Sequence, residues 1–301
     1  MTDRLPSWLP GTTRDRLLAF LDSASALPIP DRVAYFDNDG TLWTERPNYI
    51  QYEFFLQALH QRLSKDPSLA ERPAFDAALR GDRQMIGELG LERVATALAA
   101  LFDGVTPEAF ASTVDAFIDD YQHPTLPGGI EDVVYAPMLE LLAELQALDF
   151  MIAIVTGGGT EFVRRVSERL YGVPPERVVG TLIGYQFERD VTGAPRLSRT
   201  TSLLGNVNEG PNKVTHSQRQ LGRRPLLAAG NSAGDSEMLD WALSGNTPGL
   251  ALLVDHDDPV REFAYSSVSG TLQESKPISV CAEERGWLTV SIRQDWKHVF
   301  R

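Results

Sequence analysis

The sequence of 301 residues has little of three things: cysteine, long apolar runs and positive charge. Cys281 is the only cysteine, which excludes an intrachain disulfide and any cysteine-rich zinc site. No apolar run approaches the length of a membrane span, and the N-terminus (MTDRLPSWLPGTTRDR) lacks the apolar core of a signal peptide. We therefore expect a protein that has no membrane partner and resides in the cytoplasm.

The shortage of positive charge bears on the binding partner. The formal net charge is −13, whereas phosphate backbones are bound by clustered Lys and Arg, so a general nucleic-acid binder is not expected. A small anionic substrate stays possible if the site carries its own cations. The composition, 43% hydrophobic and 23% charged, is that of a globular protein large enough to bury a real core.

The most informative stretch is Val33 to Trp43, VAYFDNDGTLW. It begins as an apolar run rich in β-formers and then changes abruptly to Asp37, Asn38 and Asp39, which indicates a buried strand ending in a polar turn. Ligands of open α/β sheets lie beyond the carboxyl ends of the strands, so a site is expected here. The alternative is a turn with capping aspartates.

Similar short apolar runs recur along the chain and alternate with helical patterns. They cover 150–155, 226–229 and 250–254, with helices predicted over 136–148, 161–171, from about Lys213, and over 237–243. Residues 178–201 are predicted to form a hairpin around a turn at 191–194. The alternation predicts an α/β fold with a doubly wound, parallel, Rossmann-like sheet.

One long segment departs from the alternation. From Asn48 to about Gln122 the pattern is wholly helical, and the stretch HPTLPGG at 123–129 is typical of a hinge. We therefore predict a catalytic core made of residues 1–46 and 124–301. Residues 47–123 would form a mainly helical cap inserted after the first core strand.

Polar clusters at the strand ends suggest specific chemistry. The carboxylate of Asp37 could act as a nucleophile and form a covalent acyl phosphate, while Asp39 could protonate the leaving group and later activate water. Two carboxylates would hinder an approaching anion unless a cation offset both. Oxygen ligands select Mg²⁺, and Asn231 and Asp235 could complete a set with Asp37 and Asp39.

Two further segments could hold a phosphate. Thr156 and Gly157 begin a T-G-G-G run before a predicted helix, where backbone N–H groups and the helix dipole favour an anion. Lys213 could neutralise a phosphoryl oxygen or hold the nucleophile in place. Taken alone, the glycine run is also typical of a flexible turn, and a Lys at a helix start is usually a surface residue.

Together these residues resemble the haloacid dehalogenase superfamily, in particular its phosphoserine-phosphatase-like branch. The matching motifs are DNDGT at 37–41, VTGG at 155–158, GPNK ending at Lys213, and GNSAGDSEML at 230–239. The resemblance spans about residues 32–255 and implies a Rossmann-like core, a cap, Mg²⁺ dependence and phosphoaspartyl chemistry. The second aspartate, Asp39, favours phosphoryl transfer over halide displacement.

The sequence departs from the family pattern at two places. Asn231 stands where the phosphoserine phosphatase pattern usually has Asp, which would weaken metal binding or shift ligation toward Asp235. The family's substrate-reading Glu comes one position later than Glu45 does here, and Arg46 occupies that place. Glu45 and Arg46 are therefore candidate substrate contacts, and specificity for phosphoserine is not implied.

The sequence thus predicts a Mg²⁺-dependent phosphatase that hydrolyses a small phosphorylated metabolite. A phosphotransferase or phosphomutase would use the same residues, and a catalytically idle metabolite-binding protein is the alternative from another class. Neither the substrate nor the oligomeric state follows from the sequence.

Overall fold

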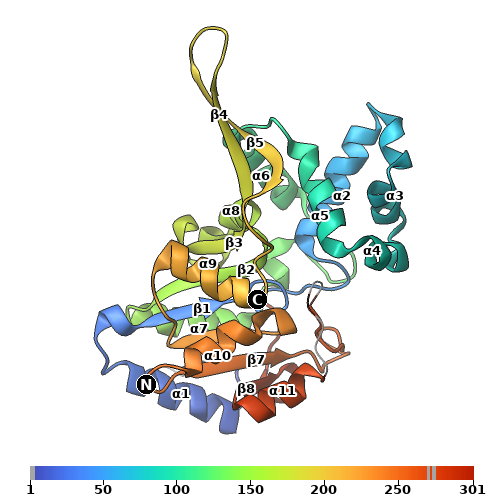
Figure 1. Cartoon of the computed structure of the whole chain (residues 1–301). Coiled ribbons are helices and arrows are strands. Elements are labelled where there is room, and N and C mark those ends of the chain that lie inside the picture. Colours follow the sequence, from blue (N-terminus) through green and yellow to red (C-terminus); the bar gives the residue numbers. More distant parts are fainter. Residues whose placement is uncertain (1–3, 270–271, 273–275) are drawn as a thin grey trace.

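The computed structural model describes residues 4–269, 272 and 276–301, and the statements below concern these residues. They contain one parallel sheet of six strands in the order β3-β2-β1-β6-β7-β8 (Figure 1). The strands are β1 (Val33–Phe36), β2 (Met151–Gly159), β3 (Val178–Thr181), β6 (Leu227–Gly230), β7 (Leu250–Asp255) and β8 (Leu288–Ser291). The predicted α/β class with a parallel, doubly wound sheet is confirmed.

The sheet is buried on both faces, which explains its continuous apolar strands. Ala34 and Phe36 of β1 belong to one apolar cluster, while Val33 and Tyr35 belong to another. Helices α1 (Thr12–Ala24), α7 (Ala136–Ala147) and α8 (Thr160–Tyr171) contribute to the first cluster. Helices α10 (Ser236–Leu243) and α11 (Ile278–Arg285) contribute to the second. Helices α9 (Pro211–Leu221) and α12 (Ile292–Asp295) complete this part.

The segment between β1 and α7 is helical, as its sequence predicts. It contains α2 (Ile50–Leu63), α3 (Pro73–Arg80), α4 (Arg83–Leu89), α5 (Leu91–Ala99) and α6 (Pro107–Asp120). These helices lie to one side of the sheet beyond the ends of its strands (Figure 1). Phe54 of α2 packs 5.4 Å from Phe162 of α8, centroid to centroid, which joins the helical segment to the core. The boundaries at 46/47 and 123/124 stay a prediction.

The predicted hairpin at 178–201 is wrong in its first strand. Residues 178–181 form β3, the edge strand of the main sheet, and the hairpin consists of β4 (Ile183–Arg189) and β5 (Pro195–Leu203). Val178 and Val179 are fully buried beside β2, whereas Phe187 in β4 is 63% exposed. The apolar residues at 178–179 therefore pack in the core beside β2 and are not part of the hairpin.

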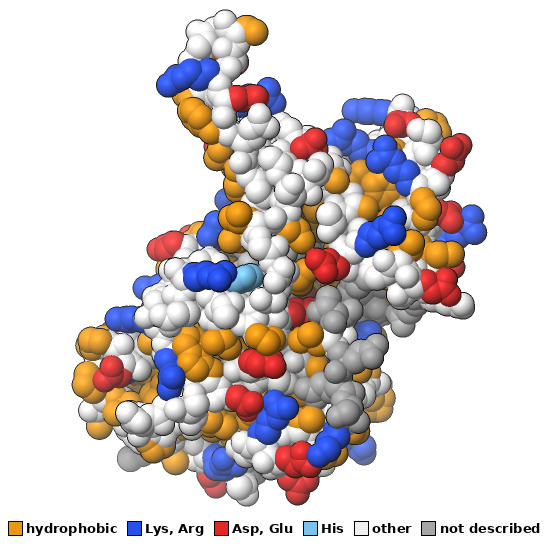
Figure 2. All heavy atoms as spheres, viewed as in Figure 1, with side chains coloured by type: hydrophobic (Ala, Val, Ile, Leu, Met, Phe, Trp, Pro, Cys, Tyr) orange, Lys and Arg blue, Asp and Glu red, His pale blue; other side chains and the backbone are white. Residues whose placement is uncertain are grey.

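The hairpin extends away from the core toward the helical segment, and Figure 2 shows apolar side chains along its stem. Its β5 strand joins the helical segment through two backbone hydrogen bonds, from Gly104 N to Arg199 O (2.9 Å) and from Arg199 N to Val105 O (2.8 Å). Among the described residues, no single helix is long and apolar enough to cross a membrane. The helices at Glu92–Phe102 and Pro107–Asp120 reach the length and apolar composition of a membrane span only when they are counted together, and the chain is bent between them.

Candidate active site

The two strands at the centre of the sheet position the main candidate residues. β1 and β6 are neighbours, and the chain crosses to opposite sides of the sheet from them, so a crevice is expected at their carboxyl ends. Asp37 and Asp39 follow β1, and Asn231 follows β6. Gly40 between these segments has φ +73°, and a Cβ there would lie 2.0 Å from the Asn231 side-chain nitrogen. Only glycine therefore allows this close approach.

Lys213, in the first turn of α9, joins two of the acidic residues. Its Nζ donates to Asp37 Oδ1 and to Asp235 Oδ1, both at 2.6 Å, and its side chain is only 2% exposed. Burial lowers the Lys213 pKa, but the adjacent Asp235 and Asp37 carboxylates reverse this and raise it above its ordinary value. The lysine is therefore a buried, charged bridge between the ends of β1 and β6.

One ammonium group cannot offset two carboxylates. Burial raises the pKa of Asp37 well above its ordinary value, the nearby Asp235 raises it further, and Lys213 opposes both effects. Burial also raises the pKa of Asp39, although Asp39 Oδ1 accepts a 2.8 Å hydrogen bond from the Trp43 indole. The described residues thus leave excess negative charge at this end of the sheet.

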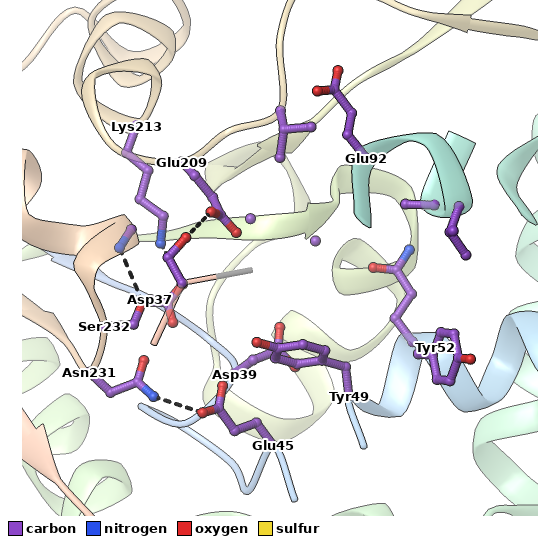
Figure 3. A pocket seen from close by; sticks show the side chains of 18 of the residues that line it. Asp37, Asp39, Glu45, Tyr49, Tyr52, Glu92, Glu209, Lys213, Asn231 and Ser232 are labelled. Carbon is purple, nitrogen blue, oxygen red and sulfur yellow. Dashed lines mark hydrogen bonds and ion pairs between the residues drawn. The ribbon is translucent and has the colours of Figure 1, made fainter. Parts of the chain in front are cut away.

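Asn231 and Asp235, the two candidate ligands after β6, are bonded differently. Asp235 Oδ2 accepts from the backbone N–H groups of Asn231 and Ser232, both at 3.0 Å, while its other oxygen accepts from Lys213. Asn231 Nδ2 donates to Glu45 Oε1 at 3.2 Å, as the dashed line in Figure 3 shows. Both Asp235 oxygens are thus occupied, whereas these bonds leave the Asn231 amide oxygen for another partner.

The glycine run differs from its prediction. β2 continues through it to Gly159 with an irregular register, because glycine backbone can still pair with Thr181 of β3, so the predicted strand end at Thr156 is wrong. Gly158 N donates to Thr156 Oγ1 at 3.0 Å, and Gly159 N donates to Gln51 Oε1 at 2.8 Å. A bound phosphate would have to replace these acceptors to use the same N–H groups.

A pocket opens between the carboxyl ends of the central strands and the helical segment (Figure 3). The predicted site residues that line it are Asp37, Asp39, Glu45, Gly157, Lys213 and Asn231. Three others lie outside its lining. Thr156 is fully buried, Asp235 lies behind Lys213, and Arg46 places its guanidinium 4.1 Å from the ring centroid of Tyr265.

Sequence patterns did not reveal several residues around this pocket. Gln51, Glu92 and Glu209 line it, although no motif singles them out. The one sequence signal for Glu209 is its position four residues before Lys213, in the loop that leads into α9. Its Oε2 accepts a hydrogen bond from Ser269 Oγ at 2.5 Å, a contact between segments that are distant in the sequence.

A second group of residues that the sequence did not predict supports the turn after β1. His256 Nε2 lies 2.9 Å from Gly40 O, and His256 Nδ1 lies 3.2 Å from Glu262 Oε2. Glu262 Oε1 also accepts from Thr44 Oγ1 at 3.0 Å and from Tyr135 OH at 2.9 Å. The turn that carries Asp39 is therefore held by a buried polar network from the C-terminal part of the chain.

The raised pKa of Asp39 predicts a pH-dependent gain in stability for Asp39→Asn. The native state binds the Asp39 proton more tightly than the unfolded state does. Protonation of Asp39 therefore contributes its full stabilisation below the ordinary Asp pKa near 4, and this stabilisation is lost as the pH rises through the raised pKa. At pH 8 without metal, we expect Asn to raise the unfolding midpoint by on the order of 2 °C or more, measured by circular dichroism. The difference should vanish toward pH 3.

The exposed Asp31 provides the matched control, because Asp31→Asn removes the same charge from the surface. Equal midpoints for Asp39→Asn and wild type at pH 8 would contradict the expected cost of burying this carboxylate.

The residues of the pocket fit a divalent cation in charge and in donor chemistry. The Asp37, Asp39 and Asn231 side chains offer oxygen donors, and the excess negative charge would be relieved by a cation. Within the described part of the chain, no three His, Cys, Asp or Glu side chains form a metal site by themselves. An amide oxygen is a suitable additional ligand, and Asn231 can supply one.

Comparison with known proteins identifies the family. The family model described as haloacid dehalogenase-like hydrolase matches residues 34–240, so the chain belongs to the haloacid dehalogenase-like hydrolases. The expected superfamily membership is thereby confirmed, and the chain is a hydrolase by family. No match was found among curated proteins.

The chain is also similar to solved structures. A protein with unknown function from Bordetella pertussis Tohama I is 20% identical, with a TM-score of 0.57, over 86% of this chain and 97% of that one. A phosphoserine phosphohydrolase-like protein from Francisella tularensis is 14% identical, with a TM-score of 0.40, over 84% and 99%. A probable phosphoserine phosphatase from Vibrio cholerae is 19% identical, with a TM-score of 0.42, over 84% and 64%.

Proposed function

We propose that this hydrolase is a Mg²⁺-dependent phosphomonoesterase that acts through a phosphoaspartyl intermediate on a small phosphorylated metabolite. The observation that carries the proposal is the buried Asp37–Lys213–Asp235 cluster, with Asp39 beside it, at the floor of a pocket. A nucleophile held by a cation and accompanied by a second carboxylate provides both covalent and acid–base catalysis.

The reaction would take two steps. In the first, an Asp37 carboxylate oxygen forms a bond to phosphorus while the bond from phosphorus to the ester oxygen breaks, and Asp39 gives its proton to the leaving alkoxide. In the second, Asp39 takes a proton from water, whose oxygen attacks phosphorus and breaks the bond to Asp37.

Other residues would orient the phosphoryl group. Lys213 Nζ would keep Asp37 in place and offset charge on the phosphoryl oxygens, and Gly157 would border them. Asp37, Asp39 and Asn231 would hold Mg²⁺, with Asp235 acting behind them through Lys213. When bound, the cation supplies charge neutralisation for the two aspartates and the phosphate.

Metal removal tests this proposal. We expect phosphate release from a panel of phosphorylated metabolites and a generic aryl phosphate to fall by at least about 100-fold in chelator, and to return when Mg²⁺ is added. Release would be followed with and without an added alcohol acceptor. Unchanged release in chelator would contradict the metal dependence, and transfer to the acceptor in excess of hydrolysis would show a phosphotransferase.

A further inference from the structure

The side chains of Glu45 and Asn231 meet in the wall of the pocket. Asn231 Nδ2 donates to Glu45 Oε1 at 3.2 Å and to Ser267 Oγ at 3.4 Å. Both residues line the pocket but are largely buried, since Glu45 is 7% exposed and Asn231 is 1% exposed. A Cβ at Gly40 would lie 2.7 Å from Asn231 Cγ and 3.0 Å from Glu45 Cδ. The two side chains are therefore packed against each other and against Gly40.

The two ends of the Asn231 amide face different groups. The amide nitrogen can only donate hydrogen bonds and a carboxylate can only accept them, so the nitrogen must face Glu45. The amide oxygen then points away from Glu45, and Figure 3 shows it on the side of Asp37. A carbonyl oxygen at this place suits a divalent cation that is also held by Asp37 and Asp39.

The contact does not depend on the charge state of Glu45. Burial raises the pKa of the Glu45 carboxyl above its ordinary value, an effect that His256 opposes and Asp39 strengthens. If Glu45 carries a proton on its other oxygen, Oε1 can still accept from Asn231. The orientation of the amide therefore follows from the position of the two side chains.

We propose that Glu45 is a positioning residue that holds the Asn231 amide with its oxygen toward the cation of the proposed phosphatase. The inference rests on the proposed function for the presence of that cation. A carboxylate at position 231 would place two acidic groups about 3.2 Å apart in a buried site, where they would repel each other. An amide supplies both the donor for Glu45 and the oxygen for the cation. The contact thus gives Glu45 a role other than the substrate contact expected from the sequence.

Two substitutions of Glu45 separate the hydrogen bond from the charge. Glu45→Gln removes the charge but keeps an oxygen that can accept from Asn231, whereas Glu45→Met has a similar length and removes both. Mg²⁺ alone would be titrated into the metal-free protein and followed by calorimetry. We expect Glu45→Met to bind Mg²⁺ about tenfold more weakly than Glu45→Gln, because the buried amide nitrogen would lose this acceptor whenever the oxygen faces the cation.

The same pair of substitutions in an Asn231→Asp background tests the contact from the other side. An aspartate side chain has no N–H group that needs an acceptor, and it offers an oxygen to the cation in either orientation. The Mg²⁺ affinities of Glu45→Gln and Glu45→Met should then agree within about threefold. Glu92→Gln and Glu92→Met are the matched control and should also agree, since Figure 3 shows Glu92 across the pocket from Asn231.

Carbon-13 NMR of the wild-type protein decides the question if Glu45→Met does not fold. With labelled asparagine, the side-chain carbonyl resonance of Asn231 should shift when Mg²⁺ is added, because the oxygen faces the cation. The two Nδ2 protons should exchange slowly with and without Mg²⁺, because Glu45 and Ser267 accept from the nitrogen. Binding of Mg²⁺ that leaves the Asn231 carbonyl resonance unmoved would overturn the inference.

The outcomes separate this inference from the proposed function. Equal Mg²⁺ affinities for Glu45→Gln and Glu45→Met would overturn the inference, while phosphate release that needs Asp37 and Mg²⁺ would leave the phosphatase in place. A difference of the same size in the Asn231→Asp background would also overturn the inference. If the wild-type protein binds no Mg²⁺, both the metal dependence and the inference fail. If the expected affinities are found but no ester is hydrolysed, only the phosphatase proposal fails.

Discussion

Asp37→Asn is expected to reduce phosphate release by at least about 10⁴-fold while the protein stays folded. An amide is a far weaker nucleophile than a carboxylate, so the acyl-phosphate step would be lost. The fold should persist because asparagine has nearly the same volume and its side-chain oxygen can still accept from Lys213. Burial already disfavours the Asp37 charge, so losing it should not lower the unfolding midpoint.

The measurement is steady-state phosphate release, with mass spectrometry used to exclude conversion of the new amide to aspartate. Asp255→Asn is the matched control, because Asp255 ends β7 of the same sheet but does not line the pocket. Activity of Asp37→Asn equal to that of Asp255→Asn would rule out Asp37 as the nucleophile.

Lys213→Met should lower both activity and stability. Methionine has a similar length but no charge, so Asp37 and Asp235 would stay buried without the cation that each contacts at 2.6 Å. We expect a loss of about 10³-fold in phosphate release and about 3 kcal/mol in the free energy of unfolding, measured near neutral pH. The stability loss should shrink in acid, because protonated carboxyl groups need no cation.

A second substitution separates the two effects. In the double variant Lys213→Met with Asp235→Asn, one buried charge is removed, so much of the stability should return while activity stays low. Lys65→Met is the control, since Lys65 is exposed in the helical segment. If Lys213→Met unfolds at the same denaturant concentration as Lys65→Met, the buried lysine does not stabilise the carboxylate cluster.

Much of the fold could be predicted because its signals are local. Apolar runs of β-formers separated by helical periodicity indicated β1, β2, β6 and β7 and the parallel sheet that they form. The failure at residues 178–201 shows the limit of this reasoning. Val178 and Val179 have the same pattern in a hairpin as in a sheet edge, and only packing against β2 decides between the two.

The site could be predicted in part for the same reason. Asp37, Asp39, Asn231 and Asp235 directly follow strands of one parallel sheet, so their segments had to meet at its carboxyl edge. The contacts of Lys213 with both Asp37 and Asp235 could not be predicted from the neighbouring residues in the sequence. It depends on where α9 packs relative to β1 and β6, and the structure brings these three residues together.

The sequence by itself determined the family motifs, the parallel core and the residues that end its central strands, because each follows from neighbours in the chain. Only the tertiary structure decided the surroundings of those residues. Glu92 and Tyr49 reach the pocket from the helical segment, Glu209 lies across from Ser269, and Asn231 bonds to Glu45. Such contacts join segments far apart in the sequence, and their geometry results from close packing of the whole molecule, which no local pattern records.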